Sequence, residues 1–422
     1  VLLGTIGVCA VYATARRLFS HGAGVISSAL YALSPLSFFF DRLAIAEPAA
    51  AASGALVVCT SVWFVRSGRR WHAVACGVAL ATALIAKASM AIFFTGPFLA
   101  GVSLSTKGSR KRAMRLAAWA YVSAALMWVP FWLLLTAKGY NYFHFAETQI
   151  GVPSLNAGGT YVANMRFIIE QLVAYFSLPV ITLFGLSAVY LVAVRARGAV
   201  YLLTVMAWTA FSLAVVARTW FAGRYVLSLS PLLVIVLGAG LAVASEAMAH
   251  RVGAFRSFVR IGLPSVAVGI WALMLALPFF TTAYTQPEGL SLSSGDRQEY
   301  VESQSAGYGR REAIAYLVEM ATQRGTPVYA VGLVADCRGM GLMLPPESGV
   351  VLNCPTIAWD GSRQSEIEDR VQKLVAEHDV YILEEGLPYV DVTISGVHLI
   401  QVETFPRPGD GEAVRILHAS QQ

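Results

Sequence analysis

A short segment between two apolar stretches carries three ionisable side chains that could act on a substrate. Asp41, Arg42 and Glu47 lie in SPLSFFFDRLAIAEP, residues 34–48. Glu47 precedes Pro48, which is favoured in the first turn of a helix, so we expect its carboxylate at a helix N-terminus, where the helix dipole stabilises it. The carboxylates of Asp41 and Glu47 are candidate catalytic groups, able to accept a proton from an acceptor hydroxyl. The structural alternative is that Glu47 caps the helix and that Asp41 pairs with Arg42 at a membrane interface.

Isolated cations elsewhere in the chain supply the complementary charge. Lys87 interrupts the apolar stretch of residues 77–97, which is long enough for two helices, so we expect it at the tip of a helical hairpin. Arg218, Arg224 and Tyr225 precede another apolar stretch. Ammonium and guanidinium groups at such positions suit a phosphate group. The alternatives are a lysine that extends to the membrane surface and arginines that anchor a helix there.

The longest expected outer loop, residues 137–172, holds two more polar candidates. His144 and Glu147 belong to its aromatic-rich sequence GYNYFHFAE. Aromatic residues at this depth usually anchor a protein at the membrane surface. The alternative is that re-entrant or interfacial helices in this loop shape a substrate cavity, which His144 and Glu147 would then line.

Together, these side chains place carboxylates and cations on one face of a helix bundle, at one depth. Charge at membrane depth is costly, so charged residues kept there are candidates for function. The combination suits transfer from a phosphate-linked donor: a carboxylate deprotonates the acceptor hydroxyl, while Arg42 and the other cations stabilise the departing phosphate. Carboxylates and phosphate could also hold Mg²⁺ or Mn²⁺, although nothing in the sequence requires a metal.

The elements that position these residues are apolar segments of bilayer-spanning length. The chain of 422 residues is 56% hydrophobic and 13% charged, against about 25% charged residues in a typical soluble domain. We therefore expect a mainly α-helical, polytopic transmembrane bundle over residues 1–281 and a second domain over residues 282–422. The ten segments expected to span the bilayer lie at about residues 1–15, 21–40, 48–65, 71–86, 89–106, 115–136, 173–194, 199–217, 225–247 and 261–281.

Basic clusters orient this bundle in the membrane. Residues 1–281 carry 21 Lys and Arg against 5 Asp and Glu, whereas residues 282–422 carry 10 against 20. Fifteen of the basic residues follow alternate segments in short loops, which by the positive-inside rule face the cytoplasm. The sequence thus predicts a plasma-membrane protein whose C-terminal domain is extracytoplasmic. The net charge of +6 reflects cytoplasmic loops and not a nucleic-acid-binding surface.

The C-terminal domain is expected to be a small soluble α/β domain. Residues 310–323 and 364–377 have helical patterns, and strands are expected from Pro327 and at residues 380–383. HLIQVETF and AVRILHA look like a closing pair of strands. The sequence of the domain contains no phosphate-binding loop and no catalytic triad, so a structural or acceptor-binding role is favoured over independent catalysis.

Two cysteines of the C-terminal domain leave one question open. Cys337 and Cys354 could form a disulfide if the domain lies in an oxidising compartment. Their spacing alone does not decide this, because a disulfide depends on how the two backbones approach each other.

The chain resembles the polytopic glycosyltransferases of the GT-C superfamily, in particular the branch of protein O-mannosyltransferases and the lipid A aminoarabinose transferase. The resemblance rests on YATARRLFSHGAGVISSALYALSPLSFFFDRLAIAEP, GVALATALIAKAS and AGRYVLSLSPLLVIVLGAGLA, and it covers about residues 1–250. It implies an inverting transfer from a polyprenyl-phosphate sugar at the outer face of the membrane.

The resemblance also assigns positions. The cation of the family's lysine turn falls on Lys87, the second acidic position on Glu47, and the Arg-Tyr pair on Arg224 and Tyr225. Glu47 stands where the family usually has Asp, which moves the charge by one methylene. The family's main catalytic acid lies in a first outer loop that is absent here. Because the chain starts at Val1 inside an apolar run, we expect it to be N-terminally truncated.

Two other classes of protein are alternatives. A transporter or flippase of lipid-linked or anionic substrates would have broken helices, internal repeats and polar residues near the midplane. A membrane scaffold would have scattered charges and an acidic, partner-binding tail. The sequence shows no clear repeat and gathers its charges at one edge, which favours the glycosyltransferase. Its expected partners are a polyprenyl-phosphate-linked sugar, membrane lipid and a lipid, glycan or protein acceptor, with no nucleic acid.

Overall fold

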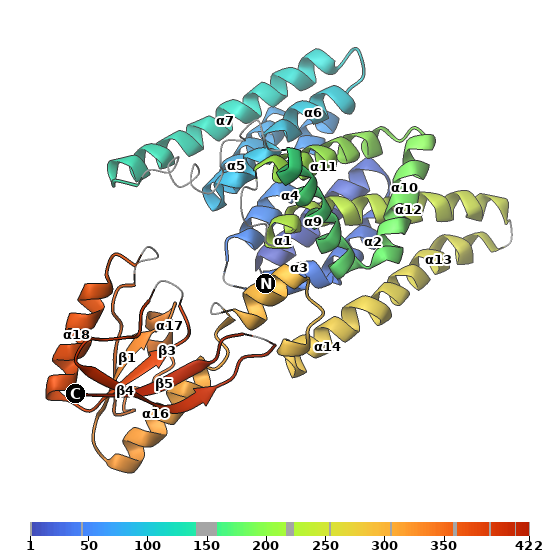
Figure 1. Ribbon diagram of the computed structural model, residues 1–422. Coiled ribbons are helices and arrows are strands. Elements are labelled where there is room, and N and C mark those ends of the chain that lie inside the picture. Colours follow the sequence, from blue (N-terminus) through green and yellow to red (C-terminus); the bar gives the residue numbers. More distant parts are fainter. Residues whose placement is uncertain are drawn as a thin grey trace. The chain divides into compact units, whose positions relative to one another are not determined.

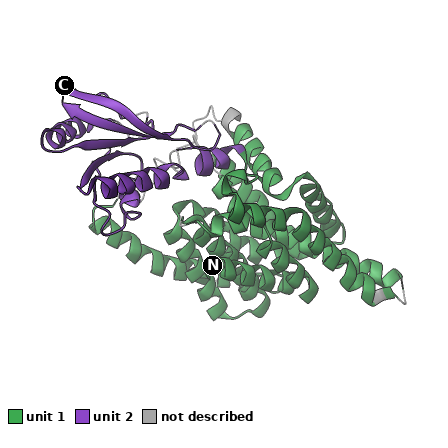
Figure 2. Ribbon diagram, turned by 90° about the horizontal axis from the view of Figure 1, so that it is seen from below, with its two compact units in different colours: residues 1–293 green, residues 294–422 purple. Residues whose placement is uncertain are grey.

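The computed structural model describes residues 2–43, 45–140, 158–216, 223–252, 255–303, 306–357, 361–387, 390–409 and 411–421. The chain divides into two compact units, residues 1–293 and 294–422, which are coloured separately in Figure 2. The described part of the first unit is helical, and the second unit contains a five-stranded sheet.

The helices of the first unit include α-helices and short 3-10 or π segments, which Figure 1 shows as a bundle. In chain order they are α1 (Leu2–Leu18), α2 (His21–Ala32), α3 (Pro35–Asp41), α4 (Glu47–Ser67), α5 (Arg70–Ala86), η1 (Ala88–Thr95), α6 (Gly96–Ser103), α7 (Arg110–Ala137), α9 (Gly158–Phe176), α10 (Leu178–Ala193), α11 (Arg197–Val216), η2 (Gly223–Leu229), α12 (Ser230–Arg251), α13 (Arg256–Trp271), η4 (Ala272–Ala276), α14 (Leu277–Thr285) and η5 (Pro287–Gly289).

Several of these helices could cross a bilayer. Two bent pairs, α2 with α3 at 57° and α9 with α10 at 108°, would each count as one broken span. With them, the described residues contain up to seven spans, and without them five. The structure thus has the apolar helices of a polytopic membrane protein, while the expected number of ten spans is not confirmed. The five unbroken spans are Glu47–Ser67, Arg110–Ala137, Arg197–Val215, Gly223–Arg251 and Ser257–Thr285.

The segments expected to span at residues 89–106 and 173–194 are not single α-helices. After α5, the backbone of Lys87 is extended (φ −162°, ψ 128°), and the chain continues as the 3-10 helix η1 before the short helix α6. Ser177 interrupts the second segment with a φ of 65°, and a proline lies in the first turn of α10. Proline fits the first turn of a helix but not its interior, so a new helix starts there.

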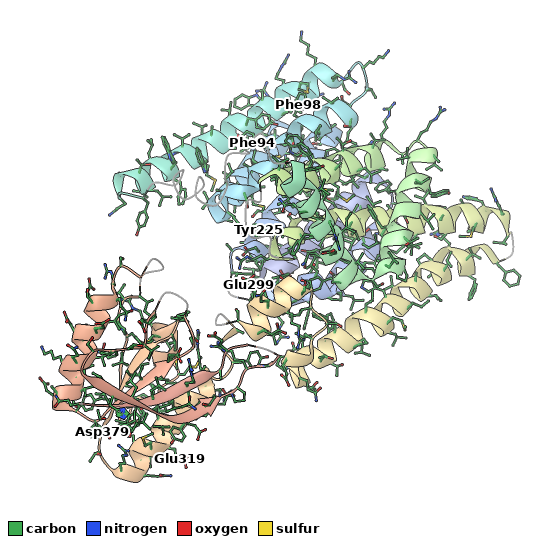
Figure 3. All side chains as sticks on the ribbon, viewed as in Figure 1. Phe94, Phe98, Tyr225, Glu299, Glu319 and Asp379 are labelled. Atoms are coloured by element: carbon green, nitrogen blue, oxygen red, sulfur yellow. A yellow bond between two sulfur atoms is a disulfide. The ribbon has the colours of Figure 1, made fainter. Side chains whose placement is uncertain are left out.

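Contacts with neighbouring helices hold η1, the 3-10 helix that follows α5, in place. Gly54 of α4 lets the ring of Phe93 lie directly on the helix, because a Cβ at that position would be 2.5 Å from the ring. Trp208 of α11 donates from Nε1 to a carbonyl oxygen of η1 at 3.0 Å. Tyr121 of α7 donates to the carbonyl oxygen of Phe94 at 2.7 Å, and Figure 3 labels Phe94 beside α7. Three helices therefore hold η1 in place.

The second unit combines a five-stranded sheet with helices. Its elements are α15 (Ser294–Arg297), η6 (Gln298–Glu302), α16 (Arg310–Arg324), β1 (Val328–Leu333), α17 (Cys337–Gly341), β2 (Val350–Asn353), α18 (Gln364–Glu377), β3 (Val380–Glu384), β4 (Val397–Phe405) and β5 (Val414–Gln421).

The strands of the second unit lie in the order β2-β1-β3-β5-β4. β1 pairs in parallel with β2 and β3, whereas β5 pairs antiparallel with β3 and β4. Side chains alternate between the faces of a strand. Accordingly, Val328 and Ala330 of β1 pack with α16, while Val331 and Leu333 pack with α18. The expected helices α16 and α18 and the closing strands β4 and β5 are confirmed; the four-residue strand β2 was not expected.

A disulfide joins Cys337 at the start of α17 to Cys354 after β2, with a Cα–Cα distance of 5.5 Å. The sequence had left this bond open. It is formed because the parallel pairing of β1 and β2 returns the chain to the start of α17.

A buried ion-pair cluster follows β3. Glu385, whose side chain is fully buried, accepts a hydrogen bond from Arg310 of α16 at 2.8 Å and another from Arg407 at 2.5 Å. The backbone amide of Ala335, which follows β1, also donates to this carboxylate. The cluster ties α16 to the segments that flank the sheet.

Candidate functional site

Glu47 lies where α4 begins, with Pro48 in the first turn as expected. Its side chain is only 10% exposed. Because both the helix dipole and nearby cations favour a negative charge at this end of a helix, a buried carboxylate is tolerated here.

Lys87 approaches Glu47 from a different helix: Glu47 begins α4, whereas Lys87 lies at the C-terminal end of α5. It follows α5, and its extended backbone ends that helix and starts η1. Its Nζ donates to Oε1 of Glu47 at 2.5 Å. The expected break of the helical hairpin at Lys87 is present, and it directs the ammonium group to the carboxylate.

Arg224 and Tyr225 come from η2, the 3-10 segment that leads into α12. Nε of Arg224 lies 3.3 Å from Oε1 of Glu47, the oxygen that also binds Lys87. The ring of Tyr225, labelled in Figure 3, packs against both cations: its centroid is 4.2 Å from Nζ of Lys87 and 5.6 Å from Cζ of Arg224. Such contacts between a cation and an aromatic face are attractive.

The resulting cluster combines one carboxylate with two cations. The side chains of Lys87 and Arg224 are 22% and 24% exposed, so both charges are largely withdrawn from solvent. Glu47, Lys87 and Arg224 together carry a net charge of +1. Guanidinium and ammonium groups that converge in this way are well suited to phosphate oxygens.

The other two charged candidates from the same segment make different contacts. Asp41, at the end of α3, lies against α1, where a Cβ on Gly4 would be 2.5 Å from Oδ2 of Asp41. The guanidinium group of Arg42 lies over the rings of Phe38 and Tyr284, at 5.0 and 4.3 Å from their centroids. The structure therefore gathers Lys87, Arg224 and Tyr225 around Glu47 and places Arg42 on aromatic rings.

The remaining sequence candidates cannot be placed. His144, Glu147 and Arg218 lie outside the described residues. Within the described part of the chain, no group of three or more His, Cys, Asp or Glu side chains is arranged to hold a metal ion. The described cluster offers a single carboxylate, so we assign no chemistry to a metal.

Sequence reasoning missed the residues that position the cluster. Gly54, Tyr121 and Trp208 hold η1, and hence the residue before it, yet each belongs to an apolar segment without a distinguishing pattern. A glycine within an apolar helix is the one signal that could have indicated such a close approach.

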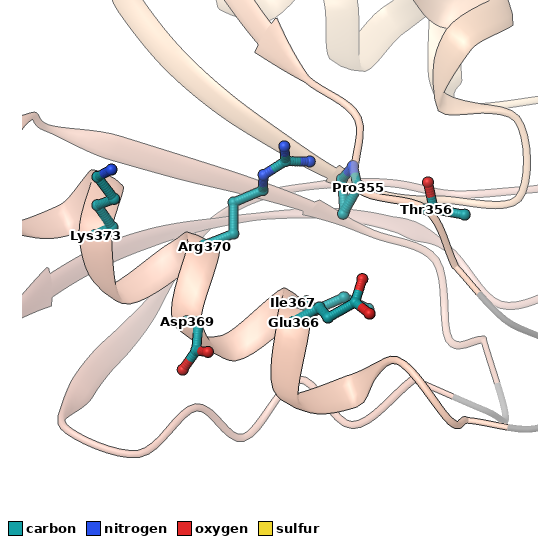
Figure 4. A pocket seen from close by; sticks show the side chains of 7 residues that line it. All are labelled: Pro355, Thr356, Glu366, Ile367, Asp369, Arg370 and Lys373. Carbon is teal, nitrogen blue, oxygen red and sulfur yellow. The ribbon is translucent and has the colours of Figure 1, made fainter.

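A depression of about 470 Å³ on the second unit is a weaker candidate (Figure 4). Its wall presents both acidic and basic side chains from α18, so no single ligand chemistry is favoured there. The residues that line it include Pro355, Thr356, Glu366, Asp369, Arg370 and Lys373.

Comparison with known proteins reveals a likeness in fold. No protein-family model matches the chain, and no curated protein matches its sequence. Among solved structures, ArnT from Cupriavidus metallidurans in the apo state matches with a TM-score of 0.63 and 14% identity, over 99% of this chain and 82% of ArnT. ArnT bound to undecaprenyl phosphate matches over the same shares with a TM-score of 0.57 and 16% identity.

A second protein shares the arrangement. The archaeal oligosaccharyltransferase AglB from Archaeoglobus fulgidus, in complex with an inhibitory peptide and a dolichol-phosphate, matches with a TM-score of 0.52 and 12% identity. The match covers 91% of this chain and 57% of AglB. At these identities, the likeness establishes the fold alone.

Proposed function

We propose that this chain, which has the fold of the GT-C membrane glycosyltransferases, transfers a sugar from a polyprenyl-phosphate donor to an acceptor nucleophile. The donor's phosphate would bind Lys87 and Arg224, with Tyr225 supporting both cations. The lipid tail would remain in the bilayer. The acceptor, whether lipid, glycan or protein, supplies a hydroxyl or another nucleophile.

One observation carries this proposal. Lys87 and Arg224 follow different apolar segments, yet both approach the same carboxylate oxygen in a largely buried cluster. Ammonium and guanidinium groups gathered in this way are well suited to the oxygens of a phosphate. A polyprenyl-phosphate sugar carries such an anion at the membrane surface, and the solved structures of ArnT and AglB contain polyprenyl or dolichol phosphate.

The proposed reaction is a substitution at the anomeric carbon. The acceptor oxygen forms a bond to that carbon while the bond from the carbon to the phosphate oxygen breaks. The hydroxyl proton passes to a carboxylate, for which Glu47 and Asp41 are the candidates. The bonding electrons leave with polyprenyl phosphate, whose added negative charge Lys87 and Arg224 stabilise. Attack opposite to the leaving phosphate inverts the anomeric configuration.

The transporter alternative has less support. The bent pairs α2–α3 and α9–α10 are broken helices, which transporters also contain. However, the fold is shared with an oligosaccharyltransferase, and the cluster stands at helix ends rather than within a broken span. We therefore favour group transfer.

The compartment of the reaction follows from the same proposal. We place the donor site and the second unit outside the cytoplasm, at the plasma membrane. The disulfide between Cys337 and Cys354 supports this location, because such bonds persist mainly in oxidising compartments.

The test is a transfer assay with the purified full chain in nanodiscs, a polyprenyl-phosphate sugar and candidate acceptors. Lys87→Ala and Arg224→Ala should each weaken donor binding by about 10- to 100-fold, as expected for loss of a charged hydrogen bond. Glu47→Gln should abolish transfer if Glu47 is the base, and Asp41→Asn if Asp41 is. The exposed Lys138, at the end of α7, provides the matched control Lys138→Ala, which should leave binding unchanged.

A specific outcome would refute the proposed donor site. Wild-type affinity in both Lys87→Ala and Arg224→Ala, with correctly inserted and folded protein, would show that these cations do not bind the phosphate.

A further inference from the structure

The two cations of the cluster share one oxygen of Glu47. Nζ of Lys87 donates to Oε1 at 2.5 Å, and Nε of Arg224 lies 3.3 Å from the same atom. The carboxylate thus occupies the position between the cations that a phosphate oxygen would need. Two anions cannot occupy this position together, because like charges at such short range repel each other strongly where solvent is largely excluded.

The environment of Glu47 explains why an internal anion is present. Its side chain is 10% exposed, and those of its two cationic partners are less than a quarter exposed. Lys87 and Arg224 carry like charges and lie on one oxygen, so an anion at this position offsets their mutual repulsion. The carboxylate of Glu47 can serve as a substitute anion while phosphate is absent.

We propose that Glu47 is this substitute: it holds Lys87 and Arg224 while the site is empty, and the phosphate of the donor displaces it. The inference rests on the proposed function, since it concerns the same donor site. Tyr225 contacts both cations through its ring and carries no charge there, so it can keep them in place while one anion replaces the other.

The exchange would link donor binding to the state of Glu47. Displacement would release the carboxylate of Glu47 from both cations, so that it could contact an acceptor hydroxyl. The acceptor would accordingly be activated only after the donor has bound.

Binding of undecaprenyl phosphate to the full chain in nanodiscs tests this inference. Glu47→Gln keeps the size of the side chain but removes the competing charge, so we expect its Kd to be about tenfold lower than that of the wild type. The matched control is Glu170→Gln on α9, where the carboxylate is 55% exposed and paired with Arg166. Its Kd should equal that of the wild type. A Kd for Glu47→Gln that equals or exceeds the wild-type value would overturn the inference.

A second variant covers the case in which Glu47→Gln does not fold. Glu47→Asp keeps the charge but withdraws it from the cations by one methylene. It should also bind undecaprenyl phosphate more tightly than the wild type. Equal or weaker binding would contradict displacement, and weaker binding that depends on added Mg²⁺ would indicate that Glu47 instead helps to hold a metal.

Inorganic phosphate separates this inference from the proposed function. If neither the wild type nor Glu47→Gln binds undecaprenyl phosphate, the proposed donor is wrong. The displacement of Glu47 by an anion is then tested by measuring the melting temperature with and without inorganic phosphate. If phosphate raises the melting temperature of Glu47→Gln, but not that of the wild type or Glu170→Gln, displacement is still supported. Identical responses of all three proteins would refute displacement.

Discussion

At the scale of single residues, two buried carboxylates each partly neutralise the charge of neighbouring cationic side chains. Glu47 in the first unit and Glu385 in the second each bind two cationic side chains. The two clusters differ in their exposure to solvent. The partners of Glu47 retain partial exposure, whereas Glu385 and Arg407 have fully buried side chains. Glu385 is therefore suited to stability and Glu47 to an exchange of anions.

Removing the charge of Glu385 should destabilise the second unit. Glu385→Gln leaves Arg310 and Arg407 buried without their carboxylate, so the free energy of unfolding should fall by about 3 kcal/mol. Chemical denaturation of the full chain, followed by a probe in the second unit, measures this. Glu319→Gln on the exposed side of α16, labelled in Figure 3, is the control and should be neutral. A neutral Glu385→Gln would contradict the assigned role.

A second carboxylate should make the stability of the same unit depend on pH. Burial acts to raise the pKa of Asp379, but hydrogen bonds with His418 and Arg324 outweigh it and hold the pKa below its ordinary value. The ionised group therefore stabilises the fold above about pH 4, and this contribution is lost as the pH falls through the folded-state pKa. Asp379→Asn should lower the melting temperature near neutral pH, by a difference that shrinks in acid. A difference independent of pH would exclude this linkage.

The sequence indicated the charged members of the site because a charge that interrupts an apolar segment is conspicuous. Lys87 interrupts an apolar segment, whereas Glu47 and Arg224 each precede one, and the structure brings the three together. Their chemical roles stay predictions. The sequence could not show that both cations approach one oxygen, since spacing along the chain does not determine tertiary contact. For the same reason, the stacking of Arg42 on Tyr284 was not foreseen.

At the scale of elements, the position of Lys87 depends on how η1 packs. The ring of Phe93 in η1 lies against Gly54 of α4, the helix that also carries Glu47. Contact between these two elements therefore sets the distance between the ammonium group and the carboxylate. Neither Phe93 nor Gly54 is charged, so this contact can be altered without changing a residue of the cluster.

Enlarging Gly54 should weaken donor binding indirectly. In Gly54→Ala, the new Cβ would lie 2.5 Å from the ring of Phe93, so η1 must shift and Lys87 with it. We expect the Kd for undecaprenyl phosphate to rise several-fold, about the effect of a misplaced binding group. Gly185→Ala on α10, where nothing lies within 4 Å of the added Cβ, is the control. Unchanged binding in Gly54→Ala would show that η1 does not position Lys87.

Helices whose apolar residues recur with a helical period were predicted well, whereas irregular elements were not. The helices at residues 310–323 and 364–377 agree with α16 and α18 because amphipathic patterns persist over several turns. Uniformly apolar stretches lack such a pattern. Hydropathy alone could not distinguish one span at residues 89–106 from η1 followed by α6, nor could it locate the break at Ser177.

At the scale of the whole molecule, the distribution of charge and the disulfide make the same topological prediction. Residues 1–281 carry a large excess of basic residues, whereas residues 282–422 are acidic. The positive-inside rule then predicts that the acidic part lies outside the cytoplasm. The bond between Cys337 and Cys354 is expected in that compartment and not in the reducing cytosol.

Labelling of intact cells with a membrane-impermeant maleimide tests this prediction. If the second unit is extracytoplasmic, Cys337 and Cys354 should stay unlabelled until an impermeant reductant opens their disulfide, and should then react without lysis. A Cys337→Ser, Cys354→Ser double variant defines the background from the other cysteines, two of which are buried. Labelling that requires lysis would place the unit in the cytoplasm. Because acceptor and donor must meet on one side of the membrane, that result would also remove an outer-face reaction from consideration.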